Sequence, residues 1–159
     1  MENDLIKAYT ARISQASKSE LVVIMYEIIL SDIDSAKKYF EAGESDSYTR
    51  ELKHAQRFLN ELMATLDYRY ELSYQLMSLY IFINKSIITA IYQKKSDNLT
   101  DAEAILKILM DGFKGIIKED KSGPVMQNTQ QLYAGLTYGK GVLNETYLNP
   151  NEQSRGFRA

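Results

Sequence analysis

His54 is the only histidine in the chain, so a search for catalytic chemistry begins with it. A catalytic interpretation would pair it with Arg50, which stands about one helical turn earlier. Some helical ribonucleases pair an arginine with a histidine, but they place more residues between the two than the three that intervene here. We therefore interpret His54 as a histidine at the margin of a helix face. RNA cleavage before and after a change at His54 would test the nuclease alternative.

The carboxylates also lack a recognisable catalytic arrangement. Bundles that hold two iron ions need Glu-x-x-His motifs on facing helices, and we expect no such motif in this chain. Asp97, Asp101 and Glu103 cluster in a loop and a helix start, where capping and the helix dipole account for them. Residues 135–141 (GLTYGKG) lack the strand–loop–helix setting of a phosphate-binding loop. We predict no catalytic, cofactor or metal site, and we do not expect an enzyme.

Composition limits the environment in which the chain is expected to work. Its 159 residues suit one domain with a single core. The absence of cysteine suits a reducing compartment. We expect no secretory signal and no membrane insertion, because no apolar run approaches the ~20 residues that a spanning helix needs. A net charge of −2 argues against nucleic-acid binding, which needs a clustered basic surface. These features predict a cytoplasmic protein.

Hydrophobic residues recur at three- and four-residue steps in four segments, which is the period of an amphipathic helix. The first helix is expected at residues 19–42. Ser17 and Glu20 have the spacing of a capping box at its start, and Gly43 ends it. Its apolar stripe consists of Leu21, Met25, Ile28, Ile29, Ile33, Ala36 and Phe40.

The second and third helices differ in the number of their apolar faces. The second, from residues 45–47 to Asp67, has a single stripe. The third, at residues 71–94, has two faces. A helix with two apolar faces is either central in the fold or leaves a strip for a partner. One face carries Leu72, Leu76, Leu79, Tyr80, Ile83, Ile87 and Ile91, and the other carries Tyr74, Met77, Ile81, Ile88 and Tyr92.

Thr100 and Glu103 repeat the capping-box spacing and are expected to open the fourth helix. Four amphipathic helices with short connections indicate an all-α fold, an antiparallel four-helix bundle over residues 1–120. Residues 121–159 hold five of the eight glycines and both prolines, together with many tyrosines and leucines. We interpret them as an extra C-terminal tail, with one short helix near residues 126–136, that needs a surface to lie against.

Three segments carry a common pattern: residues 19–30 (SELVVIMYEIIL), 61–67 (ELMATLD) and 76–91 (LMSLYIFINKSIITAI). Together they resemble FliS, the family of flagellar export chaperones. The resemblance covers about residues 5–118, and departures include Lys18 in place of a usual proline and Phe113 in place of a frequent tryptophan. The residues that match the family pattern are Tyr9, Glu20, Leu21, Met25, Tyr26, Leu62, Met63, Leu66, Asp67, Leu76, Leu79 and Tyr80.

The resemblance implies a bundle that binds the disordered C-terminal segment of newly made flagellin. That segment becomes partly helical as it wraps the bundle, which hides the surface through which flagellin polymerises. The resemblance also implies that the complex presents flagellin to the flagellar export gate. The second apolar face of the third helix fits this expectation, because recognition of a partner helix needs such a surface.

Methionine and tyrosine side chains adapt to irregular partner surfaces. The residues expected to contact flagellin are Met63, Tyr74, Met77, Ile81, Ile88 and Tyr92. Alternatively, several of them pack against neighbouring helices, or the face joins two copies of a non-enzymatic regulatory protein; the oligomeric state stays open. The tail from about residue 127 to residue 148 is predicted to cover the flagellin groove partly in the free protein.

Overall fold

The computed structural model describes residues 3–119 and 123–124, and this part of the chain contains five helices and no strand. The prediction of an all-α fold is confirmed for it. The predicted tail lies outside the described residues except for Gly123 and Pro124. The helices are α1 (Asn3–Gln15), α2 (Lys18–Glu41), α3 (Ser45–Ala64), α4 (Glu71–Gln93) and α5 (Leu99–Ile117).

The predicted capping box forms at the start of α2. The Oγ atom of Ser17 accepts a hydrogen bond from the backbone N–H of Glu20 at 3.3 Å, and the Glu20 carboxylate accepts one from the backbone N–H of Ser17 at 2.8 Å. These bonds satisfy donors that the first turn of a helix cannot satisfy internally. At the other end, Gly43 has a φ of 76°, which glycine adopts without a steric penalty, and the chain turns into α3.

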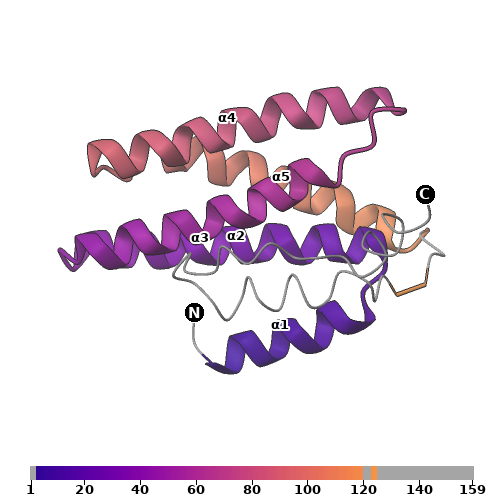
Figure 1. The fold of residues 1–159 in the computed structure, drawn as a ribbon, viewed down its shortest axis with the longest axis horizontal. Helices are drawn as coiled ribbons and strands as arrows, with labels where there is room; N and C mark the ends of the chain where they lie inside the picture. The colour runs from indigo at the N-terminus through magenta and orange to yellow at the C-terminus, as the bar shows by residue number, and fades with distance from the viewer. Residues whose placement is uncertain (1–2, 120–122, 125–159) are drawn as a thin grey trace, which may run out of the picture.

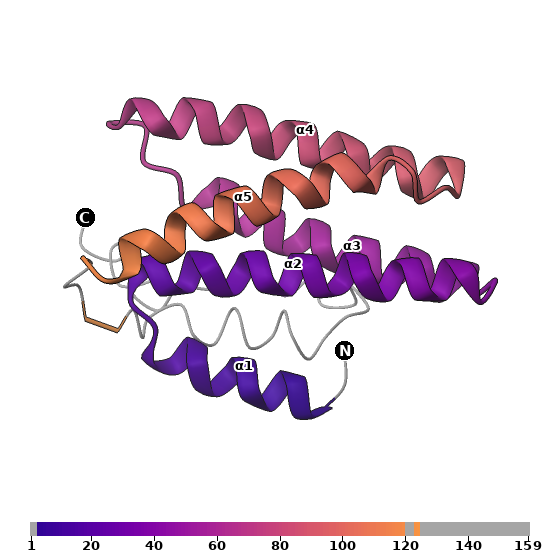
Figure 2. The ribbon, with the colours of Figure 1, turned by 180° about the vertical axis from the view of Figure 1, so that it is seen from behind.

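The α2 helix lies at the centre of the molecule. It packs against α3 and α5, while α1 lies against its outer side and α4 rests on α3 and α5 (Figures 1 and 2). No other described helix contributes as many buried side chains. Its buried residues are Leu21, Val23, Ile24, Met25, Tyr26, Ile28, Ile29, Asp32, Ile33 and Ala36.

The sequence-based expectation of four helices was incomplete because it missed α1. Ile6, Tyr9 and Ile13 stand three and four residues apart on this helix, and they face α2 with Ile13 fully buried. An ion pair between Arg12 of α1 and Glu27 of α2 adds to this contact. The helical spacing was therefore present, but a helix of 13 residues is marginal without a surface to pack on.

The predicted capping box at the start of α5 was wrong. The helix begins at Leu99, and its N-cap Asn98 makes no side-chain capping bond. Thr100 lies inside the first turn, and Glu103 forms an ion pair with Lys37 of α2 instead. Burial of Leu99 favours a helix that begins before Thr100, so tertiary packing overrides the local capping-box spacing. The predicted stripe of the first helix also ends differently, since Phe40 is exposed.

Candidate partner-binding site

One stripe of α4 faces the rest of the bundle. Its residues recur at steps of three and four, as expected for a helix with one buried side. Leu72, which was expected in this stripe, is exposed, because α4 and α5 are far apart at the start of α4 (Figures 1 and 2). The buried residues of the helix are Ser73, Leu76, Tyr80, Ile83, Ile87 and Ala90.

The opposite side of α4 is apolar and open. Tyr74, Ile81 and Ile88 follow one another at intervals of seven residues, so they form one line along the helix. Lys85 is the single charged residue between positions 72 and 93. The exposed fractions are 60% for Tyr74, 44% for Ile81, 38% for Ile88 and 83% for Tyr92.

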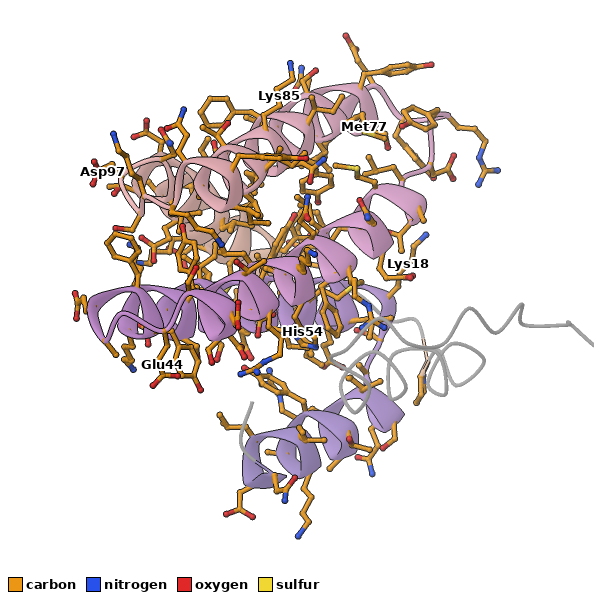
Figure 3. All side chains as sticks on the ribbon, turned by 60° about the vertical axis from the view of Figure 1, so that its left-hand side comes forward. Lys18, Glu44, His54, Met77, Lys85 and Asp97 are labelled. Carbon is orange, nitrogen blue, oxygen red and sulfur yellow. The ribbon has the colours of Figure 1, made fainter. Side chains whose placement is uncertain are left out.

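Contacts with α3 show on which side of α4 this line lies. The Nε2 atom of Gln56 donates to Oδ1 of Asn84 at 2.8 Å, and Nζ of Lys94 donates to Oγ1 of Thr49 at 2.6 Å. The two helices run antiparallel. Met63 stands seven residues after Gln56 on α3, and it is therefore level with Met77, which stands seven residues before Asn84 on α4. Both methionines are half-buried, and Figure 3 shows Met77 on α4 above the end of α3.

The six residues singled out from the sequence therefore belong to one region. Met63 and Met77 lie at the α3–α4 junction. The other four residues are exposed on the side of α4 beside that junction. We call this region the α3/α4 face. It offers a partner two flexible side chains at its base and two tyrosines at its ends.

His54 lies away from this face, on the side of α3 next to α1 (Figure 3). It is buried, and its Nδ1 atom is 2.7 Å from Oδ2 of Asp32, which is also buried. Burial raises the pKa of Asp32 to about 6, although the hydrogen bond with His54 opposes the rise. Arg50 contacts Glu51 at 3.6 Å. His54 is thus paired with a carboxylate from α2.

Glu51 and His54 have the Glu-x-x-His spacing, so the expectation that the chain lacks this motif was wrong. In a di-iron bundle a second such motif would face it. Within residues 3–119, no three His, Asp or Glu side chains gather in a way that could hold a metal ion. Among the described residues, every buried side-chain nitrogen and oxygen has a hydrogen-bond partner. The cluster is therefore a satisfied polar contact between α2 and α3.

A family model described as flagellar protein FliS matches residues 1–120. The chain belongs to the FliS family. The match spans all five described helices, including α1, which holds Tyr9 and lies mostly within the range of the resemblance. No curated protein matches the chain significantly. None of the described helices of this FliS-family chain is long and apolar enough to cross a membrane.

Two tyrosines that match the FliS pattern meet inside the bundle. The hydroxyl oxygens of Tyr26 and Tyr80 are 2.5 Å apart. Phe113 packs its ring 5.7 Å from that of Tyr26. Burial raises the pKa of both tyrosines, so both hydroxyls keep their protons. These three side chains connect α2, α4 and α5 and hold the α4 helix of this FliS-family protein in place.

Sequence reasoning missed several exposed aromatic residues near the α3/α4 face. Tyr68 and Tyr74 pack their rings 5.0 Å apart, and Tyr70 is exposed in the same turn. The signal was available, because three tyrosines fall within the run YRYELSY at residues 68–74. Phe82 is exposed as well, and it points roughly 100° around the helix axis from Ile81. The FliS-family chain therefore presents more apolar surface around α4 than the six predicted residues.

Proposed function

We propose that this FliS-family chain is a cytosolic chaperone that holds the C-terminal helical segment of flagellin. By covering that segment it prevents premature polymerisation and assists export during flagellum assembly, with the flagellar export gate as a second partner. The observation that carries the proposal is the α3/α4 face. Tyr74, Ile81 and Ile88 stand in line on an exposed helix side that has one charged residue, which in water is unfavourable unless a partner covers it.

The dimensions of the face suit an amphipathic helix. Tyr74 and Tyr92 are 18 residues apart, which corresponds to about 27 Å along a helix. A partner helix of similar length could place apolar residues at three- and four-residue steps against the line. Part of the interaction energy would be used in ordering the flagellin segment, so the complex would be firm but releasable. Release is a requirement for an export chaperone.

A charge placed in the line tests the proposal. Ile81→Glu should weaken binding of a C-terminal flagellin segment from the same organism at least tenfold in isothermal titration. Met77→Lys should act in the same direction. The matched control is Gln75→Glu, which adds the same charge to an exposed position roughly 120° around the helix axis from Ile81 and should leave the affinity unchanged. Circular dichroism checks that each variant is folded, and wild-type affinity for Ile81→Glu would exclude the face as the binding site.

The exposed line on α4 also supports a second candidate, a regulatory bundle that dimerises through the same face. Sedimentation of the isolated protein separates the two functions. A dimer that the flagellin segment does not dissociate favours the regulatory protein. A monomer that forms a one-to-one complex favours the chaperone.

A further inference from the structure

A second apolar surface lies on the other side of α4, and the proposed flagellin contact does not use it. Leu72 and Phe82 of α4 and Ile108 and Ile116 of α5 are exposed, with Ile108 reaching 70%. At 100° per residue, Leu72 points roughly 160° around the helix axis from Tyr74, and Phe82 points roughly 80° from each of the two, between them. We call this surface the α4/α5 face. Leu79, Ile105 and Leu109 are half-buried beside it.

The α4/α5 face is open because the two helices diverge. They are close at their connection and separate toward the start of α4 and the end of α5 (Figures 1 and 2). The end of α5 leans toward α2, where Phe113 packs against Tyr26. Gly112 and Gly115 would meet nothing within 4 Å if they carried a Cβ atom. The described residues therefore leave this side of α5 uncovered.

The chain's own continuation starts at this face. The α5 helix ends at Ile117, directly after the exposed Ile116, so the chain leaves the helix at the wide end of the opening. Residues 118–124 can span roughly 23 Å when extended, which is enough to turn back along α5. We propose that residues 125–139 cover the α4/α5 face.

Charge and size both support this occupant. Residues 125–139 (VMQNTQQLYAGLTYG) contain no charged residue, and the α4 side of the face contains none between Leu72 and Phe82. The eleven residues from Leu72 to Phe82 correspond to about 16 Å of helix, and the short helix expected from the sequence at residues 126–136 would have the same length. The tether also gives the segment a high effective concentration at the face, in the millimolar range for short flexible linkers.

This placement differs from the expectation drawn from the sequence, in which the tail covers the flagellin groove. On the α4/α5 face the segment leaves Tyr74, Ile81 and Ile88 free for a partner. The two apolar sides of α4 then have separate occupants, one within the chain and one outside it. A covered α4/α5 face would also be unable to bind flagellin or a second copy of the chain.

The absence of cysteine from the chain allows a direct test on the full-length protein. Ile108→Cys is combined with Tyr133→Cys and treated with a short bifunctional maleimide. We expect an intramolecular cross-link at the mass of the monomer, formed at least tenfold faster than in the control pair Lys53→Cys with Tyr133→Cys. Lys53 is exposed on α3. Equal rates in the two pairs, or a cross-linked dimer alone, would overturn the proposal.

A second measurement separates this segment from flagellin as the occupant. Ile108→Glu changes an exposed residue, so the bundle should stay folded. Introduced into the chain with Leu79→Cys and Tyr133→Cys, it should slow the cross-link at least fivefold while leaving flagellin affinity unchanged. If Ile108→Glu weakens flagellin binding and added flagellin abolishes the cross-link, then flagellin occupies the face and the proposal fails. The Ile81→Glu test of flagellin binding is independent of this result.

Discussion

The hydroxyl groups of Tyr26 and Tyr80 are hydrogen-bonded to each other inside the bundle. A buried polar group that loses its partner costs ~1–3 kcal/mol, whereas removing both partners can be nearly neutral. We expect Tyr80→Phe to lower the free energy of unfolding by about 1–2 kcal/mol. The double change of Tyr26 and Tyr80 to phenylalanine should cost less than the two single changes together. Urea unfolding of the four proteins measures this, and additive costs would show that the hydroxyls do not interact.

Asp32 should make the stability of the protein depend on pH. Its folded-state pKa of about 6 lies above its ordinary value of 3.8, because burial outweighs the hydrogen bond with His54, and Glu51 of α3 raises it further. The folded chain therefore holds this proton more tightly than the unfolded chain. The resulting stability is present below pH 3.8 and is lost as the pH rises through about 6.

Comparison with Asp32→Asn isolates this contribution. The free energy of unfolding of the wild-type protein, relative to that of Asp32→Asn, should fall by about 2 kcal/mol between about pH 4 and pH 7. Asp34→Asn is the matched control, because Asp34 is an exposed carboxylate on the same helix. A difference that stays constant with pH would contradict the assignment of the titrating group to Asp32.

Among the helices, the two capping-box spacings in the sequence have different outcomes. Ser17 caps α2, whereas Thr100 lies within α5 and makes no capping bond. We expect Ser17→Ala to lower the free energy of unfolding by about 1 kcal/mol. Thr100→Ala should change it by less than ~0.5 kcal/mol, because alanine is the better helix former. Chemical unfolding of both variants distinguishes them, and equal losses would mean that Thr100 also acts as a cap.

The same contrast shows which features the sequence could predict. The course of α2 was predictable because Ser17, Glu20 and Gly43 define its ends through local chemistry, and its stripe is long and regular. The existence of α1 and the start of α5 depend on surfaces that other helices supply, such as the site where Ile13 is buried. At the candidate site, the second face of α4 was visible in the spacing of Tyr74, Ile81 and Ile88. The pairing of Asp32 with His54 was not, because it joins different helices.

For the molecule as a whole, the proposed function predicts a one-to-one complex with flagellin. Binding should require the C-terminal helical segment of flagellin and should show a negative heat-capacity change, because apolar surface leaves water. Isothermal titration at several temperatures measures both quantities. Unchanged binding after deletion of that segment from flagellin would contradict the proposal.

The position of α2 has a consequence for the rates at which backbone amides exchange with deuterated water. The core of α2 is covered by its neighbours, whereas α4 rests on α3 and α5 and leaves one side open. Amides of α2 should therefore exchange only through global unfolding, and those of α4 through smaller, more frequent openings. Mass spectrometry of exchanged peptides should find α2 the slowest, and a bound partner should slow α4 most. Under the proposed function, the helix that contacts the partner would then open and close again while the core stays folded.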